Sequence, residues 1–301
     1  MTELTFLGTG TSQGVPIIAC QCPVCQSAHP RDKRFRSSAL FRQNGLTVLV
    51  DAGPDFRCQM LANDIRHLDA ILFTHFHKDH TGGLDDVRSF NYIDKKAVEV
   101  FCEAPVLKAL QNDYSYVFAQ HKYPGAPELH VHLIDERPFR VDSLANSPCL
   151  EWVHDVGYLY RLPDGSLQTP DNRVTDAPHD HPNIIPIRGY HDQLPVLGFR
   201  MGGIAYLTDL SRLPESELPK LQGLEHVSLN TVGYYPHHSH FSLEQALELA
   251  GRIGARHTWL THLSHAFPTY PVFCEQLHRL CREKGISSDV QPAWDGLTIS
   301  D

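Results

Sequence analysis

The stretch HLDAILFTHFHKDH, residues 67–80, places four side chains that can bind metal ions directly after an apolar run. They are His75, His77, Asp79 and His80. The run predicts a buried strand, and a loop that leaves a strand can turn alternate side chains inward. His75 and His77 can therefore hold one metal ion, and Asp79 and His80 can face a second one. Such ligands suit zinc, manganese or iron, and two ions about 3.5–4 Å apart are a known hydrolytic arrangement.

The same order of features, an apolar run followed by a residue that can bind metal, occurs at three other places. LTVLV precedes Asp51, IAYLT precedes Asp209, and TWLT precedes His262. Functional residues of layered α/β folds gather at the carboxyl ends of strands. The pattern therefore predicts an α/β fold with its chemistry at such an edge.

Local signals predict further elements. Asn44-Gly45 lies between two apolar runs, which is typical of a β-hairpin. FSLEQALELAGRIGA predicts a helix, because Ser242 and Gln245 form a capping pair and Gly254 can end it. The run GGLDDVRSF predicts the start of another helix.

Composition and charge exclude several classes of protein. With 42% hydrophobic and 20% charged residues, the chain is expected to be globular. Its net charge of −9 argues against extended nucleic-acid binding, because phosphate contacts need clustered Lys and Arg. No apolar run reaches the roughly 20 residues of a membrane span, so no membrane association is expected. The first residues do not resemble a secretory signal, and a cytoplasmic location is expected.

The motif H-x-H-x-D-H at 75–80 resembles the signature of the metallo-β-lactamase superfamily, and the resemblance covers nearly the whole chain. It implies an α/β fold, a four-layer αβ/βα sandwich in which two mixed sheets carry helices on their outer faces and the metals lie at one edge. It also implies two metal ions with a water or hydroxide between them, and an Asp51 that supports the loop by hydrogen bonds. In this assignment the first ion is bound by His75, His77 and His191, the second by Asp79, His80 and His262, and Asp209 bridges both.

Three cysteines within six residues, Cys20, Cys22 and Cys25, form a second cluster in a chain with 8 Cys and 20 His. A tight cluster in a chain of this size is more typical of a metal site than of disulfides. A tetrahedral zinc needs a fourth ligand, for which His265, three residues after His262, is the candidate. The combination resembles the phosphoribosyl cyclic phosphate phosphodiesterase branch of the superfamily, in which a Cys3His zinc is structural. Three buried or redox-active thiols are the alternative interpretation.

The segment 234–240 directly precedes the predicted helix. In the phosphodiesterase branch a histidine of this segment lies near the metals and contacts the substrate phosphate or the leaving oxygen. His240 fits best, because it is nearest the helix N-terminus, where anions are favoured. His237 and His238 are the alternatives.

The features and the resemblance together predict a dinuclear metal-dependent phosphodiesterase whose substrate is a small, cyclic ribose phosphodiester. The expected catalytic residues are Asp79, Asp209 and His240, with His240 as general acid. The expected cofactors are two divalent ions (zinc or manganese) and one structural zinc. A homodimer is compatible with this branch.

Three alternatives share these motifs. A β-lactamase or thioesterase uses the same metals, but a secreted lactamase would carry an export signal. A transfer-RNA 3′-processing nuclease needs a basic recognition arm, and the sequence has no basic run to supply one. A non-hydrolytic metal-binding protein of quinone cofactor biosynthesis keeps the cysteine site but degrades the central motif, which is intact here.

One departure from the compact phosphodiesterase pattern concerns spacing. The interval from His80 to His191 is 111 residues (191 − 80 = 111), longer than expected. The additional residues lie in the stretch 120–186, where we expect loops and hairpins inserted into a single domain of residues 1–301. Insertions between these motifs shape the substrate pocket, so the exact substrate stays open.

Overall fold

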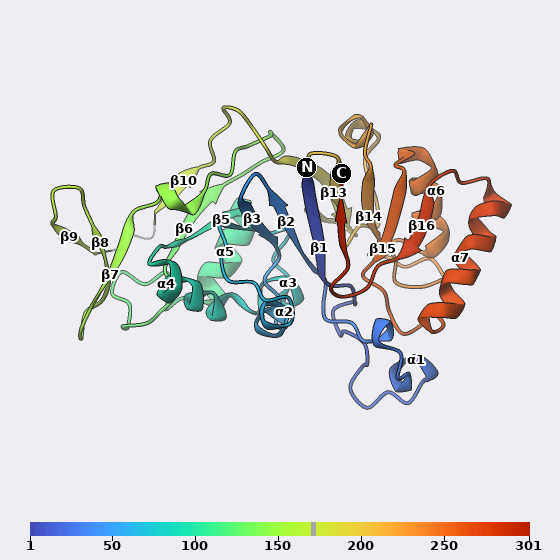
Figure 1. Cartoon of the computed structure of the whole chain (residues 1–301), viewed down its shortest axis with the longest axis horizontal. Helices are drawn as coiled ribbons and strands as arrows, with labels where there is room; N and C mark the ends of the chain where they lie inside the picture. The colour runs from blue at the N-terminus through green and yellow to red at the C-terminus, as the bar shows by residue number, and fades with distance from the viewer. Residues whose placement is uncertain (170–172) are drawn as a thin grey trace. The chain divides into compact units, whose positions relative to one another are not determined.

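The computed structural model describes residues 1–169 and 173–301 (Figure 1). They form two compact units. The terminal unit comprises Met1–Phe41 and Ile184–Asp301, and the middle unit comprises Arg42–Asn183. Both units contain sheets and helices, which confirms the expected α/β class. The limits of the middle unit do not coincide with the expected insertion at 120–186, and the single-domain organisation stays a prediction.

A parallel sheet with strand order β10-β6-β5-β4-β3 forms the centre of the middle unit. Its strands are β3 (Leu46–Val50), β4 (Ala70–Leu72), β5 (Val98–Cys102), β6 (Leu129–Leu133) and β10 (Val174–Asp176). β4 and β5 are buried along their whole length, as expected where both faces of a parallel sheet are covered. The turn before β3 has positive φ at Asn44 (51°) and Gly45 (86°), which a type I′ hairpin requires.

The remaining elements of the middle unit are short. The helices are α2 (Phe56–Ala62), α3 (Lys78–Thr81), η2 (Leu84–Val87), α4 (Arg88–Asp94), α5 (Ala104–Asp113) and η3 (Leu144–Asn146). The helix predicted from GGLDDVRSF is confirmed by η2 and α4. An antiparallel sheet consists of β7 (Cys149–Val153), β8 (Gly157–Arg161) and β9 (Leu167–Gln168).

The stretch 120–186 therefore contains the expected hairpins, but it also contributes β6 and β10 to the central parallel sheet. The description of this stretch as surface loops and hairpins was wrong for these two strands. β6 has the sequence LHVHL, in which two histidines interrupt the continuous apolar run that marks a strand of a parallel sheet.

A mixed six-stranded sheet, ordered from β11 to β16, organises the terminal unit. Its strands are β11 (Ile185–His191), β12 (Leu194–Met201), β13 (Ile204–Tyr206), β14 (His226–Asn230), β15 (His257–Thr261) and β16 (Asp289–Pro292). β12 pairs antiparallel with both β11 and β13, and β13 to β16 are parallel. β1 (Thr2–Gly8) pairs with β17 (Thr298–Ser300), and the limit between the units falls within β2 (Ser38–Gln43).

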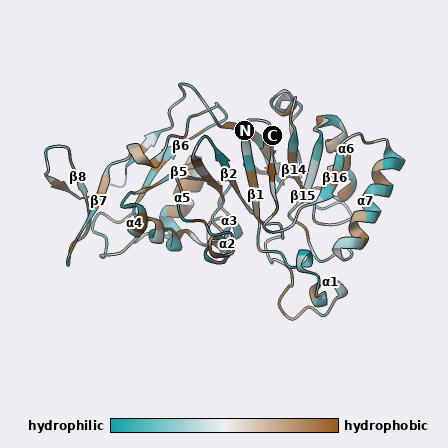
Figure 2. Cartoon of the chain, in the orientation of Figure 1, coloured by the Kyte–Doolittle hydropathy of each residue, from teal (hydrophilic) through white to brown (hydrophobic). Residues whose placement is uncertain are grey.

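Two long helices pack on the apolar core of the terminal unit. They are α6 (Leu243–Ile253) and α7 (Tyr270–Lys284). The short helices of this unit are α1 (Pro23–Gln26), η1 (Pro30–Asp32) and η4 (Glu215–Leu221). Both hydrophobic and hydrophilic residues occur along α6 and α7, as amphipathic helices require (Figure 2). α6 has the predicted capping box between Ser242 and Gln245, and Gly254 ends it at φ 67°. None of the helices in the described ranges combines the length and apolar character needed to cross a membrane.

Candidate metal sites

The loop after β4 carries His75 and His77, and α3, which follows it directly, carries Asp79 and His80. The rings of His75 and His77 have centroids 4.6 Å apart, and those of His75 and His80 are 4.2 Å apart. His80 Nε2 lies 3.3 Å from Asp79 Oδ2. That separation matches two ligands at about 2.0–2.1 Å from one zinc in tetrahedral geometry. The side chains therefore suit a metal ion, and their role as ligands stays a prediction.

Asp51 holds this loop in place, as the sequence predicted. Its carboxylate accepts hydrogen bonds from Thr74 N and Thr74 Oγ1, both 2.9 Å, and lies 2.7 Å from His80 Nδ1. Burial raises the pKa of Asp51, whereas His80 opposes that shift. A carboxylate at Nδ1 fixes the tautomer of a ligand histidine and leaves Nε2 for the metal. Thr74, which supplies two of the contacts, was not recognised from the sequence.

Gly53 marks a close approach that the sequence did not reveal. A Cβ at this position would lie 2.0 Å from the backbone oxygen of Asp79. Gly83 is equally confined, because its Cβ would lie 2.1 Å from Gly53 O. Only glycine lets the segment after β3 pack directly under the metal-binding loop.

We therefore expect Gly53→Ala to lower the melting temperature and to displace the first turn of α3, which carries Asp79. Overpacking typically costs about 1–3 kcal/mol, or roughly 2–12 °C in a chain of this size. Gly251→Ala in α6 is the matched control, because its Cβ meets nothing closer than 3.9 Å and alanine favours a helix. Thermal melts of both variants check this. A Gly53→Ala protein that melts like Gly251→Ala would contradict the packing argument.

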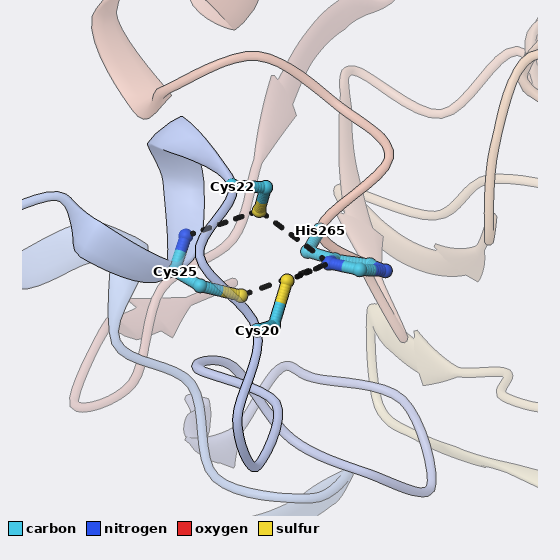
Figure 3. Close-up of side chains that lie close together, drawn as sticks. All are labelled: Cys20, Cys22, Cys25 and His265. Carbon is cyan, nitrogen blue, oxygen red and sulfur yellow. Dashed lines mark hydrogen bonds between the residues drawn. The ribbon is translucent and has the colours of Figure 1, made fainter.

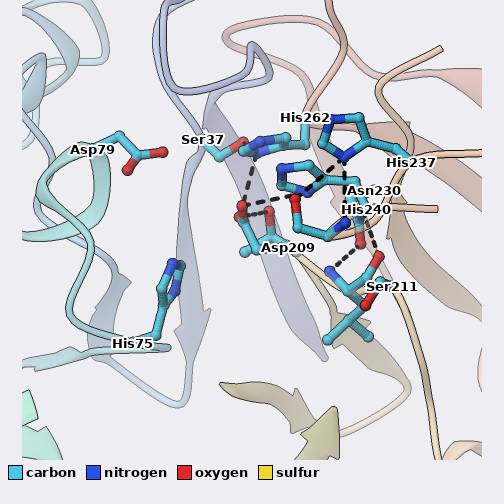
Figure 4. A network of polar contacts seen from close by, with 12 residues as sticks. Ser37, His75, Asp79, Asp209, Ser211, Asn230, His237, His240 and His262 are labelled. Carbon is cyan, nitrogen blue, oxygen red and sulfur yellow. Dashed lines mark hydrogen bonds and ion pairs between the residues drawn. The ribbon is translucent and has the colours of Figure 1, made fainter. Parts of the chain in front are cut away.

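A second set of candidate ligands lies in the terminal unit, at or just after the ends of β11, β13 and β15. Figure 4 shows Asp209, His240 and His262 of this set. His262 Nδ1 is 3.3 Å from Asp209 Oδ2, and His240 Nδ1 is 3.7 Å from Asp209 Oδ1. The ring of His240 lies between those of His191 and His262, with centroid distances of 4.6 and 4.8 Å. Donor atoms of His191, Asp209 and His240 all lie within 4.8 Å of one another. The two histidines predicted as ligands in this unit, His191 and His262, thus lie close to the predicted bridging carboxylate of Asp209.

Two residues that the sequence did not single out support this set. Asn230 at the end of β14 accepts from Leu210 N at 2.7 Å and donates to Leu210 O at 2.9 Å, which fixes the residue after Asp209. Ser37 Oγ donates to Gly10 O at 2.9 Å and lies 3.0 Å from His262 Nδ1. These contacts join segments far apart in the chain, and no local motif indicates them.

Three of the strand-end residues share an uncommon backbone conformation. Asp51, Asp209 and His262 have φ values of 63°, 56° and 54°. Left-handed conformations are rare for residues other than glycine, and such strain concentrates at functional sites. The backbone turns sharply where each of these side chains leaves its strand.

His240 is half-buried beside the N-terminus of α6. Burial and the neighbouring His262 lower the pKa of His240 to about 3. The imidazole is therefore neutral near pH 7, whereas the predicted general acid must carry a proton. The ring centroids of His237 and His240 are 5.3 Å apart, and His238 is exposed. The catalytic role of His240 stays a prediction.

The cysteine cluster converges on His265 (Figure 3). His265 Nδ1 lies 3.2, 3.5 and 3.7 Å from the sulfurs of Cys20, Cys22 and Cys25. Zinc at about 2.3 Å from sulfur and 2.0–2.1 Å from nitrogen requires separations of about 3.5 Å, so the four donors fit a tetrahedral zinc. These thiols form no disulfide. Zinc as the occupant stays a prediction.

Local structure makes one of these thiols acidic. Cys22 is the N-cap of α1, and the hydrogen bond from Cys25 N at 3.4 Å lowers the pKa of Cys22 to about 6. Burial raises the pKa of Cys25 to about 11 in the chain alone. A bound cation favours the thiolate form of every ligand. A bound metal ion would therefore offset the free energy that is needed to place three thiolates close together.

Comparison with known proteins defines the class of this fold. The model of the β-lactamase superfamily domain matches residues 47–263. The structure of a "New Diphosphatase from the PhnP Family" is 30% identical, with a TM-score of 0.76, and the match covers 100% of this chain and 98% of that chain. The fold is thus the metallo-β-lactamase fold. The chain belongs to the β-lactamase superfamily and, within it, to the PhnP-like branch.

Two curated relatives carry other names. "Octanoyltransferase" of Porphyromonas gingivalis (strain ATCC BAA-308 / W83) is 34% identical over 275 residues, which are 90% of this chain and 48% of that protein. "Ribonuclease Z" of Mycobacterium sp. (strain KMS) is 25% identical over 338 residues, covering 97% of this chain and 100% of that protein. The chain spans about half the length of the first curated relatives it matches.

Proposed function

We propose that this chain is a metal-dependent hydrolase of small phosphodiesters, with cyclic ribose phosphates as its preferred substrates. The observation that carries the proposal is the grouping, within each unit, of imidazole and carboxylate donors that are buried or half-buried. The diphosphatase at 30% identity supports phosphorus–oxygen bond cleavage as the reaction.

The dinuclear centre is part of this proposal. In the superfamily assignment, the ligands from the loop 75–80 and those at Asp209, His191 and His262 would hold one pair of divalent ions. Bound ions supply Lewis-acid activation of the phosphoryl group and neutralise its charge. The zinc or manganese identity of the ions is likewise proposed.

Residues of this chain would perform the remaining tasks. Asp51 fixes the orientation of His80 through its 2.7 Å contact, and Asn230 fixes the backbone beside Asp209. His240 would donate a proton to the leaving oxygen. A bound phosphodiester carries one negative charge, which raises the pKa of a neighbouring imidazole and offsets the effect of burial.

A second candidate substrate class is the diphosphate linkage, favoured by the name of the solved relative. The relatives named Octanoyltransferase and Ribonuclease Z add transfer of an octanoyl group and cleavage of RNA as further candidate activities. We also propose that the protein acts on a small cyclic diester, forms a homodimer and is cytoplasmic. We propose further that it does not bind extended nucleic acid.

A substrate screen tests the proposal. The metal-replete protein is assayed with a cyclic ribose phosphate, bis(p-nitrophenyl) phosphate, a dinucleotide joined by a diphosphate, and a thioester. We expect the highest kcat/KM with the cyclic diester and loss of turnover with a chelator. Preference for the diphosphate would favour the second candidate. Turnover of the thioester alone would overturn both.

The role of His240 has a separate test. If it is the general acid, His240→Ala should slow diesters with alkoxide leaving groups by about 10²-fold or more, because such groups need a proton. Aryl diesters should lose far less, because phenolate leaves without one. His154→Ala is the control, because the His154 side chain is 89% exposed, and it should leave both rates within about twofold. Equal losses on the two substrate types in His240→Ala would remove His240 from the acid role.

A further inference from the structure

A third cluster of metal-binding side chains lies in the middle unit, apart from the motif loop and from the cysteine site. It consists of Glu99 on β5 and of His130 and His132 on β6. The two strands are parallel neighbours, with Glu99 opposite His130. Since side chains alternate along a strand, His130 and His132 share a face, and the register places Glu99 on the same side.

The three side chains converge on one point. Glu99 Oε2 lies 2.9 Å from His130 Nδ1 and 2.6 Å from His132 Nε2. The two imidazole rings have centroids 4.4 Å apart, and the donor atoms of all three residues lie within 4.8 Å of one another. Zinc at about 2.0–2.1 Å from each ligand needs ligand separations of about 3.3 Å. Each contact would lengthen by less than about 1 Å when an ion enters.

Neighbouring groups hold two of these residues in orientation. His132 Nδ1 lies 3.0 Å from Thr175 Oγ1 on β10, and the ring of His132 stacks on Phe101 at 4.5 Å. Ser147 Oγ donates to the second oxygen of Glu99 at 2.6 Å. Hydrogen bonds to the far sides of ligands are typical of metal sites, because they fix the tautomer and the carboxylate.

Glu99 has neither lysine nor arginine among its ion-pair partners in the described part of the chain. Glu99 is 8% exposed, and its ion-pair partners in the described part of the chain are the two histidines. An ionised carboxylate in this position requires a positive charge beside it. His130 Nε2 is buried, and none of the described residues gives it a hydrogen-bond partner. A cation bound by the three residues would balance the carboxylate.

A cavity of about 240 Å³ adjoins the cluster and leaves room for a water molecule as a further ligand. Arg140 also lines it, but its charge is compensated by Asp142 at 2.9 Å and by Asp180. The guanidinium therefore does not repel a cation as an unpaired arginine would.

We propose that Glu99, His130 and His132 form a binding site for a divalent transition-metal ion such as zinc, with one coordination position open to the cavity. Two imidazoles and one carboxylate are a ligand set that suits zinc, and three protein ligands leave a fourth position free. The site is separate from the proposed catalytic and cysteine sites, so its occupancy does not depend on the proposed function.

Equilibrium dialysis of the full-length protein against Zn²⁺, followed by elemental analysis, tests this proposal. Glu99→Gln and His132→Gln keep the size and polarity of the side chains but weaken the ligand set. The control is His154→Gln, since the His154 side chain is 89% exposed. At saturation, wild type and control should bind one zinc per chain more than either cluster variant. Equal zinc content in all four proteins would overturn the proposal and leave a hydrogen-bonded triad only.

Hydrogen exchange of the wild-type protein provides a second readout that needs no variant. Added Zn²⁺ should slow amide exchange in β5 and β6 at the same concentrations at which the last zinc equivalent binds, because ligand binding stabilises the segments it joins. Exchange in these strands that is unaffected throughout the titration would overturn the proposal, even if the variants fail to fold.

Discussion

Replacing Asp209 by alanine is expected to reduce turnover of the preferred phosphodiester by about 10³-fold or more, while the protein stays folded. Asp209 is the proposed bridge between two metal ions, and its carboxylate lies 3.3 Å from His262 and 3.7 Å from His240. Charge stabilisation by metals contributes several kcal/mol to such reactions, and each 1.36 kcal/mol is a factor of about ten. Steady-state kinetics with saturating metal and a thermal melt measure the two effects.

Asp155→Asn is a suitable control, because the side chain of Asp155 is 86% exposed, contacts only its neighbour His154 among the described ion pairs, and asparagine tolerates the left-handed backbone at φ 62°. It should keep wild-type activity and melting temperature. Retention of more than about a tenth of wild-type activity in Asp209→Ala at saturating metal would be incompatible with a bridging role.

Replacing Cys22 by serine is expected to act on stability instead. The thiol of Cys22 lies 3.5 Å from His265 Nδ1 and is one of four donors that fit zinc. Metal binding at a structural site contributes directly to folding free energy. A loss of at least about 3 kcal/mol would lower the melting temperature by roughly 6–12 °C. A strong chelator should lower the melting temperature of wild type further than that of the variant.

Cys58→Ser tests whether the effect is specific to the cluster. Cys58 is an exposed free cysteine on α2, and its replacement should leave the melting temperature within about 1 °C. The structural role would be wrong if Cys22→Ser melted like wild type and lost only activity.

Local signals in the sequence determined much of this protein. The capping box at Ser242 and the left-handed Gly254 define α6, because both interactions involve residues within one or two helical turns. Asn44-Gly45 specifies its turn through positive φ values alone. The H-x-H-x-D-H motif places its four candidate ligands in one short loop and the first turn of α3, so their proximity also follows from spacing along the chain.

Asp209 and His262 lie far along the chain from the motif at 75–80. They were predicted as ligands from the family resemblance. Asp209 and His262 follow apolar runs, as many surface residues do. Only the parallel pairing of β13, β14 and β15 brings their strand ends together. Strand order is a property of the folded sheet, and a single sequence does not show it.

The tertiary structure alone revealed the supports and the additional cluster. Asp51 contacts Thr74 and His80, which lie 23 and 29 residues further along the chain. Position 53 must be glycine because a Cβ there would collide with the backbone oxygen of Asp79. β6 was missed because histidines interrupt its apolar pattern, and the same histidines meet Glu99 from the neighbouring strand. Hydrogen bonding and packing between segments depend on distances in space. Local sequence fixes only the conformations within each segment, so these contacts are decided when the strands pair.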